Sequence, residues 1–300
     1  MTPAVAARLG TRGRFLPYVL GTGLLALSVA AALFCVYALA VGDPYAGFLL
    51  TGVAAVPLGW LLRRLGSPDA DPSRREALNT VLLSWLLLPA LGAIPYAVSG
   101  ELGPLDAFFE SMSGFTTTGA TTIADFALVP DTLLLWRAVS QWVGGVGILV
   151  LFLAVFPQLA IAGRQVFHAE MPGPNQERLT PRLRQTALAV VTLYLAFTLA
   201  CAAAYLLAGM GPFEALAHAF GTLAAGGFSP NANSFAAYQE PALQWIGVVF
   251  MTLSGTSFFL VYRAVTGHPR DVLRDPEFRA YAGIILTAGL LLALLLRAEH

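Results

Sequence analysis

The feature that most constrains this chain is a series of seven apolar runs, each about as long as a helix that crosses a membrane. A spanning α-helix needs about 20 apolar residues, because it rises about 1.5 Å per residue through a hydrocarbon layer about 30 Å thick. The runs lie at about 15–41, 46–62, 77–99, 132–156, 183–208, 242–262 and 280–296. We therefore expect an all-α membrane protein with about seven transmembrane helices.

The composition is not that of a soluble protein. Hydrophobic residues make up 57% of the 300 positions and charged residues only 11%, whereas a soluble domain carries about 25% charged residues. Lipid must therefore be the main solvent of the chain. The formal net charge is zero, which argues against nucleic acid as a partner. Cys35 and Cys201 both lie within apolar runs, so we interpret them as buried apolar side chains and not as a disulfide or a metal-binding pair.

Arginine residues gather on one side of the expected membrane topology. All 17 basic residues are arginine, and all but Arg137 and Arg297 fall on the same side if the spans simply alternate. By the positive-inside rule this side is the cytoplasm, which places the N-terminus there as well. The first run could also belong to a cleaved signal peptide ending near residues 38–40, but it is longer than a usual signal sequence.

Two segments do not fit a plain bundle of helices. Residues 100–131 hold a short helix-compatible run that starts at Pro104, followed by the Gly- and Thr-rich stretch 113–122, whose composition favours an extended backbone. Residues 211–229 repeat this order after the fifth run. Both segments must leave and return on the outer side, so each is predicted to be a re-entrant pore helix with an extended tail. Non-helical backbone at membrane depth persists only where protein buries it or where it lines water.

The two segments belong to an internal repeat. Aligning Gly119 with Gly226 gives a spacing of 107 residues, which also pairs Gly114 with Gly221. Trp136 then lies near Trp245, and residues 144–147 lie near residues 254–257. We divide the chain into a two-span extension (1–75), a first repeat (76–182), a second repeat (183–278) and the start of a third (279–300). Repeats of this kind in membrane proteins usually surround the axis along which substrate passes.

Other glycines and a histidine have simpler explanations than ion transport. Glycine within an apolar run more often lets helices pack closely than lines a pore, and we expect packing for Gly144, Gly145 and Gly255. His218 is expected to pack or to hydrogen-bond within its own short helix.

The charged residues near the first re-entrant segment also have simpler explanations. Asp106 and Glu110 are predicted to cap their helix rather than to attract cations. Arg137, one of the two arginines on the outer side, is expected to pair with Asp131, Asp125 or lipid headgroups.

The residues of the first re-entrant segment resemble the signature of a known family. The sequence FFESMSGFTTTGAT at residues 108–121 is similar to the first pore loop of bacterial Trk potassium transporters of the TrkH type. Further similar stretches are 135–137, 141–142, 144–148, 179–182, 219–229 and 273–279. The resemblance covers about residues 75–297, and these motifs are specific in combination.

The resemblance implies a potassium-channel superfamily in which four covalently linked repeats each supply one pore loop. Carried over by position, the filter residues would be Thr116, Thr117, Thr118, Gly119 and Ala120 in the first loop and Ala224, Ala225, Gly226 and Gly227 in the second. Carbonyl oxygens of Thr117, Thr118, Ala224 and Ala225 would bind K⁺ as the transported ion, and no cofactor is expected. Backbone carbonyls can replace the hydration shell of K⁺. Only glycine adopts φ > 0 without strain, which we expect at Gly119 and Gly226.

The family implies potassium uptake across the bacterial cytoplasmic (inner) membrane. Its members form homodimers and bind a cytosolic nucleotide-binding, TrkA-like regulatory subunit, for which we expect contacts at 158–184 and 263–279. Two alternatives are a Ktr-type sodium-dependent potassium channel subunit, which usually lacks the two N-terminal spans, and a non-conducting membrane scaffold. An enzyme is not expected, because the sequence offers no nucleophile–base arrangement and no paired His/Cys metal set.

The chain departs from the family in the number of its loops. A complete member needs four pore loops, whereas this sequence contains two and its last residues fall within the predicted third repeat. We therefore expect a fragment or a truncated reading frame of a longer protein, the alternative being that two chains complete one pore. We expect this chain not to conduct by itself.

Overall fold

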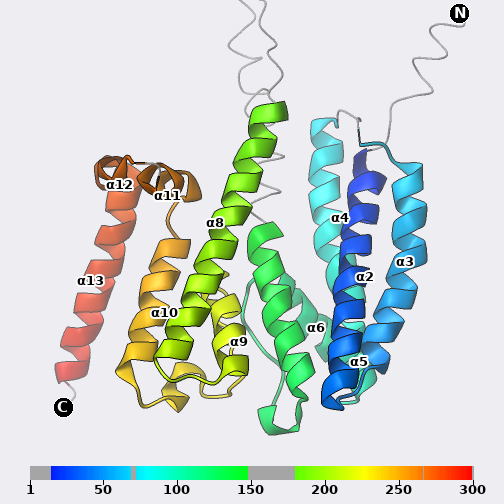
Figure 1. Ribbon diagram of the computed structural model, residues 1–300, viewed down its shortest axis with the longest axis horizontal. Helices are drawn as coiled ribbons and strands as arrows, with labels where there is room; N and C mark the ends of the chain where they lie inside the picture. Colours follow the sequence, from blue (N-terminus) through cyan, green and yellow to red (C-terminus); the bar gives the residue numbers. More distant parts are fainter. Residues whose placement is uncertain (1–14, 69–71, 148–179, 266, 299–300) are drawn as a thin grey trace, which may run out of the picture.

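The computed structural model describes residues 15–68, 72–147, 180–265 and 267–298. Over these ranges the chain is helical, with short 3-10 turns and no β-strand. Figure 1 shows most of the long helices running side by side, the arrangement that satisfies backbone polar groups in lipid. The predicted fold class is therefore confirmed. The arginines before residue 15 and most of the predicted partner stretch 158–184 lie outside the described residues.

The N-terminal extension is a helical hairpin of α2 (Phe15–Val41) and α3 (Ala46–Leu65). The backbones of the two helices touch at Gly21, where a Cβ atom would clash with the backbone of α3. The turn of the hairpin holds Asp43, whose Oδ2 accepts hydrogen bonds from Oγ1 (2.6 Å) and N (3.1 Å) of Thr132. This contact fastens the hairpin to the first repeat.

The next helix, α4 (Arg74–Gly92), begins at Ser73, whose side chain caps it by accepting a hydrogen bond from the N–H of Glu76 (3.3 Å). Glu76 Oε1 accepts a hydrogen bond from the N–H of Phe15 (2.8 Å). The starts of α2 and α4 therefore lie on the same side of the helical layer, as alternating spans require. The short α5 (Ile94–Ser99) completes this crossing.

Each re-entrant segment contains a helix of 12 residues, α6 (Pro104–Phe115) and α9 (Pro212–Leu223). Both helices begin with proline after a glycine and carry an acidic residue in the first turn, which suits a helix N-terminus. Each is followed by non-helical backbone and then by a 3-10 turn, η1 (Phe126–Leu128) or η2 (Ser234–Ala237). The predicted order of short helix and extended tail is confirmed.

Most of the predicted spans are confirmed. Among the described residues, five helices are long and apolar enough to cross a membrane: Phe15–Val41, Ala46–Leu65, Arg75–Ser99, Leu188–Leu207 and Pro276–Arg297. The last two belong to α8 (Thr180–Leu207) and α13 (Pro276–Ala298). The fourth predicted run, 132–156, is helical from residue 131 to residue 147, and its remainder lies outside the described residues. We call this element the 131–147 helix.

The sixth predicted span, 242–262, is wrong as a single helix. α10 (Pro241–Ser254) ends after 14 residues and is followed by α11 (Phe258–Val265) and α12 (Pro269–Arg274). In Figure 1, α11 and α12 lie across the end of α10, where the chain turns into α13. The break falls at residues 255–257, a Gly-Thr-Ser sequence whose glycine and hydroxyl side chains weaken a helix.

Among the residues that the structure describes, the buried apolar side chains form two clusters, one around each re-entrant helix. In the first cluster, Trp136 packs against two phenylalanines of the N-terminal hairpin and donates a hydrogen bond to the carbonyl of Gly92 (3.1 Å). In the second, the hydroxyls of Tyr205 and Thr222 form a hydrogen bond (2.9 Å). The two cysteines are free thiols, one buried and one half-buried, as expected. These clusters hold α6 and α9 at fixed positions, which in turn place the two filter segments.

Candidate functional site

The two predicted filter segments have the same backbone conformation. Each contains two residues in the left-handed region, Thr117 (φ 53°) and Gly119 (φ 78°) in the first, and Ala225 (φ 49°) and Gly227 (φ 84°) in the second. Left-handed backbone is uncommon for threonine and alanine, so its presence at matching positions marks a shared, strained turn.

The hydrogen bonds that lead into the segments match as well. In the first loop, the N–H groups of Thr117 and Thr118 donate to the carbonyls of Gly114 and Ser113, each at 2.9 Å. In the second, the N–H groups of Ala225 and Gly226 donate to the carbonyls of Thr222 and Gly221, each at 3.1 Å. Each segment therefore leaves its helix by the same tight turn.

The spacing between the repeats differs from the one predicted. The structure pairs Gly119 with Gly227 and Pro104 with Pro212, a spacing of 108 residues, so the predicted pairing of Gly119 with Gly226 at 107 is wrong by one position. The left-handed backbone predicted at Gly226 is found at Gly227 instead. Two adjacent glycines in the second loop made both alignments plausible from sequence, and only the backbone angles distinguish them.

Gly226 needs to be glycine for a different reason. A Cβ atom there would clash with the side chain of Gln141, whereas a Cβ atom at Gly227 would meet nothing within 4 Å. Gly226 is thus required by close packing, and Gly227 by backbone conformation.

The two segments lie in direct contact. A Cβ atom at Gly119 would clash with the carbonyl oxygen of Gly226 and would lie 3.6 Å from the Cα of Gly227. The structure therefore brings the two predicted glycine segments together, although more than 100 residues separate them in sequence.

The carbonyl oxygens predicted to bind the ion are not engaged in hydrogen bonds with the described part of the chain. Within the described residues, no hydrogen bond is accepted by the carbonyl oxygens of Thr117, Thr118, Ala224 or Ala225. Thr118 and Ala225 are exposed, and the other two residues are half-buried. Exposed carbonyls at membrane depth need a polar partner, which a partly dehydrated cation supplies.

Ala120, the last residue predicted for the first filter segment, differs from the others. Its carbonyl accepts a hydrogen bond from Oγ of Ser113 (2.6 Å), so this oxygen is already bonded to α6. The hydroxyl of Thr116 is also engaged, since it donates to the carbonyl of Met112 (2.7 Å). The free carbonyls of the first loop therefore lie between these two anchored ends.

A second group of residues, which the sequence did not reveal as a unit, lies on one face of the 131–147 helix. A Cβ atom at Gly144 would clash with the carbonyl of Phe115, and one at Gly145 would lie 3.2 Å from the Cα of Ala224. The helix therefore supports both loops closely, and the predicted packing role of these glycines is confirmed. Gly255 has a similar packing role, because a Cβ atom there would clash with the hydroxyl of Tyr281.

Arg137 and Glu110 form a buried ion pair between this helix and α6. The side chains of Arg137 and Glu110 are 3% and 0% exposed. The predicted pairing of Arg137 with Asp131, Asp125 or headgroups is therefore wrong. A buried guanidinium needs a carboxylate at close range, and within the described residues Glu110 supplies it.

The role predicted for Glu110 is wrong as well, because Glu110 lies in the middle of α6 and not at its end. Its carboxylate accepts hydrogen bonds from Oγ1 of Thr121 (3.0 Å) and from the N–H of Thr122 (3.0 Å). Glu110 thus holds Thr121 and Thr122, where the first loop returns from the filter segment. Opposite charges in two apolar segments were the sequence signal, but a separation of 27 residues hid the pairing. Asp106 does lie in the first turn of α6, as predicted.

His218 occupies the position in α9 that Glu110 occupies in α6. Its Nδ1 forms a hydrogen bond with the carbonyl of Glu214 (2.9 Å), which confirms the prediction that it bonds within its own helix. Its Nε2 forms a hydrogen bond with Oγ of Ser229 (3.1 Å). Ser229 is the counterpart of Thr121, so both loops are held by the same residue position, with a carboxylate in one and an imidazole in the other.

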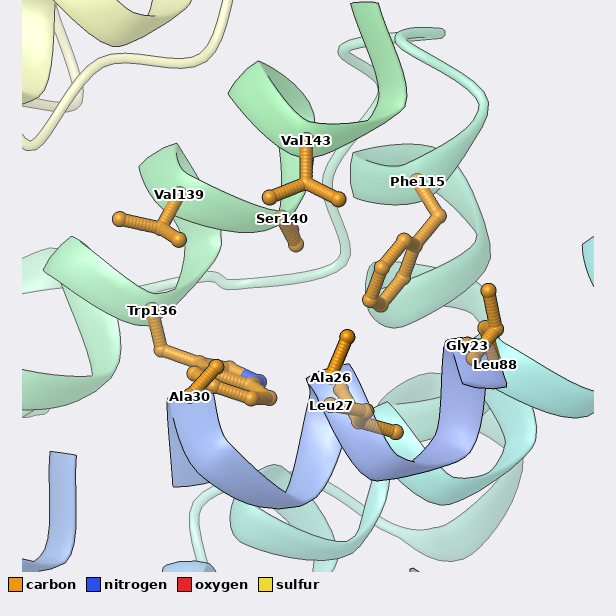
Figure 2. Close-up of a pocket in the computed structure, with 10 residues that line it drawn as sticks. All are labelled: Gly23, Ala26, Leu27, Ala30, Leu88, Phe115, Trp136, Val139, Ser140 and Val143. Carbon is orange, nitrogen blue, oxygen red and sulfur yellow. The ribbon is translucent and has the colours of Figure 1, made fainter. Parts of the chain in front are cut away.

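An apolar cavity of about 180 Å³ lies behind the first loop. Figure 2 shows Phe115 and Val143 on one side of it, Ala26 and Ala30 of α2 on the other, and the ring of Trp136 at one end. The lining offers almost no polar atoms, so this cavity is not part of an ion path. The space next to Thr116 and Thr117 is a separate opening, lined also by Trp85 and Gly144.

Comparisons with known proteins agree with this architecture. Residues 48–298 match the TrkH family model, described as a cation transport protein. The chain is 41% identical over 232 residues to the Trk system potassium uptake protein TrkH of Vibrio parahaemolyticus, which covers 75% of this chain and 48% of that protein. It is 40% identical over 226 residues to the protein of the same name from Escherichia coli K12, covering 74% of this chain and 47% of that protein.

A solved structure shows the same fold. The crystal structure of the potassium transporter TrkH from Vibrio parahaemolyticus superimposes with a TM-score of 0.83 at 35% sequence identity, over 96% of this chain and 60% of that chain. The chain spans about half the length of the curated relatives that it matches. The family-model match, which extends over most of the sequence, and the shared fold lead to one conclusion: the chain belongs to the TrkH family of cation transport proteins.

Proposed function

We propose that this chain supplies two of the filter segments of a membrane pore for potassium uptake. The observation that carries the proposal is the contact between the Gly119 and Gly226 segments, with free carbonyl oxygens on the adjacent residues. Rings of such carbonyls select K⁺ by replacing its hydration shell. The relatives named as potassium uptake proteins support K⁺ as the ion.

The dipoles of the two re-entrant helices favour a cation at the filter segments. α6 and α9 both end where a filter segment begins, so the C-terminal end of each helix faces that segment. The C-terminus of a helix carries a partial negative charge, which stabilises a nearby cation. This arrangement suits a cation and disfavours an anion.

The corrected spacing changes which carbonyls act together. With Gly119 paired to Gly227, Thr117 corresponds to Ala225 and Thr118 to Gly226. We therefore propose that these four carbonyls contribute to the ion sites at equivalent levels. The carbonyl of Ala224, chosen from the sequence, would then correspond to that of Thr116 at the inner end of the segment.

The placement in the membrane follows the arginines. Arg63 and Arg64 end α3, and Arg75 lies at the start of α4, on the side where α2 begins. We propose that this side faces the cytoplasm of a bacterium, with the N-terminus inside. The two additional N-terminal helices favour a Trk-type protein over a Ktr-type subunit.

Partners and activity of the whole protein belong to the same proposal. Arg270, Arg274 and Arg279 are exposed on the α11–α13 stretch, which makes this stretch a suitable contact for a cytosolic nucleotide-binding regulatory subunit. We propose a homodimer with such a subunit, a transport role without enzymatic activity, and no cofactor other than the transported K⁺.

The test is growth of a potassium-uptake-deficient bacterial strain on low K⁺, with the intact protein that contains these 300 residues. Gly119→Ser is expected to abolish growth, because its side chain would clash with the carbonyl of Gly226 and strain a left-handed backbone. The matched control is Gly100→Ser, which has a similar φ of +85° but open space around it and lies outside the filter. Growth of both variants like the wild type would contradict the proposed filter.

A further inference from the structure

The 131–147 helix of the first repeat reaches across to the second loop through two side chains. Oε1 of Gln141 accepts a hydrogen bond from the N–H of Phe228 (3.1 Å). Nη1 of Arg137 donates a hydrogen bond to the carbonyl of the next residue, Ser229 (2.9 Å). Two consecutive residues of the second loop are therefore held by side chains one helical turn apart, across 87 and 92 residues of sequence.

Gln141 is placed directly behind the second filter segment. Its side chain is fully buried, and it fills the space where Gly226 would otherwise carry a Cβ atom. Its Nε2 group has no hydrogen-bond acceptor among the described residues, although such a buried donor normally has one. The protein therefore keeps a polar side chain at this place at an energetic cost, while its oxygen atom holds the backbone of Phe228.

Arg137 links this contact to the first loop. Its guanidinium pairs with Glu110, which holds Thr121 and Thr122, and it also lies over the ring of Phe228 at 3.6 Å from the ring centre. A continuous chain of contacts thus runs from Thr121 and Thr122 of the first loop, through the buried Glu110 and Arg137, to the second loop. These groups lie behind the filter segments and do not include the free carbonyls.

We propose that Gln141, together with Arg137, positions the second filter segment relative to the first and thereby sets the discrimination between K⁺ and Na⁺. This role depends on the proposed function, since it requires that the two segments form an ion filter. The separation between carbonyl oxygens of different repeats sets the size of an ion site and the field within it, and both influence the preference for one ion over a smaller one. The hydrogen bond between Gln141 and Phe228 fixes the backbone two residues after Gly226, where a shift would move the carbonyls of Ala225 and Gly226.

The experiment compares Rb⁺ and Na⁺ uptake by the intact protein in membrane vesicles, with Gln141→Met as the test variant. Methionine has a similar length and shape, but its thioether sulfur is only a weak acceptor for the N–H of Phe228. We expect the ratio of Rb⁺ to Na⁺ uptake to fall about fivefold, which corresponds to a loss of about 1 kcal/mol in the discrimination between the two ions. The ratio does not depend on the amount of folded protein, so a merely structural role would leave it unchanged.

The matched control is Val143→Met on the same helix, which lines the apolar cavity. We expect its uptake ratio to equal that of the wild type. If Gln141→Met cannot be recovered from membranes, Gln141→Asn serves instead, because it keeps the amide but is too short to reach Phe228. An unchanged ratio in the recovered Gln141 variant, or an equal fall in the control, overturns the proposed role of Gln141.

The failure of this inference can be told apart from the failure of the proposed function. A wild-type protein that shows no preference for Rb⁺ over Na⁺ would contradict the filter itself. A selective wild type with a selective Gln141 variant would contradict only the positioning role.

Discussion

The two loops of this chain share one backbone but are held in place by different chemistry. Both have a 12-residue helix, the same turn into the segment and left-handed residues at matching positions. The first loop is held by the buried carboxylate of Glu110, and the second by the side chains of His218 and Gln141, while Arg137 bonds both to Glu110 and to the carbonyl of Ser229. The comparison teaches that the repeat preserves the path of the backbone, while each loop can be braced by its own set of side chains.

Loss of Arg137 is expected to have the largest effect on stability. Arg137→Met leaves the carboxylate of Glu110 buried without its partner, which costs about 3–5 kcal/mol. Thermal unfolding of the intact protein in detergent measures this loss. The double variant Arg137→Met with Glu110→Gln should regain much of the stability, because it removes both charges. If the double variant were as unstable as the single one, the unpaired charge of Glu110 would not be the cause of the loss.

Substitutions at the two adjacent glycines of the second loop are expected to differ in their effects. Gly226→Ala forces a new methyl group against Gln141 and should cost about 1–3 kcal/mol. Gly227→Ala only strains a left-handed backbone and should cost about 1 kcal/mol. The same unfolding measurement compares them. A larger loss for Gly227→Ala than for Gly226→Ala would contradict the separate roles given to the two glycines, close packing at Gly226 and left-handed backbone at Gly227.

The smallest effect on stability is expected at His218. His218→Leu removes the hydrogen bonds of the imidazole to Ser229 and to the carbonyl of Glu214, while Oγ of Ser229 still accepts from the N–H of Asn231, so we expect a loss of about 1 kcal/mol. The value should be well below that of Arg137→Met, because no charge is left unpaired. Thermal unfolding in detergent measures both losses. Equal losses for His218→Leu and Arg137→Met would mean that the contacts of His218 and the ion pair of Arg137 contribute equally to stability.

Much of the fold could be predicted because it depends on local sequence. The apolar runs set the long helices, and proline after glycine marked the first turn of α6 and of α9. The segment around Gly119 was recognisable because glycine beside threonine does not suit a helix interior. The contact between the two segments followed from the repeat, which places equivalent parts around one axis.

The remaining features depend on partners that are distant in sequence. Arg137 had several acidic candidates nearby, and only the packing of α6 against the 131–147 helix selects Glu110. The break after α10 was hidden in an apolar run of the right length for a span. Gln141 stands in a stretch that resembles the family, but its role could not be predicted locally, because the backbone that it holds lies in the second loop.

The central claim is that free carbonyls of the two facing segments bind the transported ion. The most direct measurement is the anomalous diffraction signal of Rb⁺ in crystals of the intact protein. The claim predicts Rb⁺ peaks between the Gly119 segment and the Gly226–Gly227 segment, next to the carbonyls of Thr117 and Ala225. Rb⁺ peaks found only elsewhere in the protein, with none between these two segments, would contradict it.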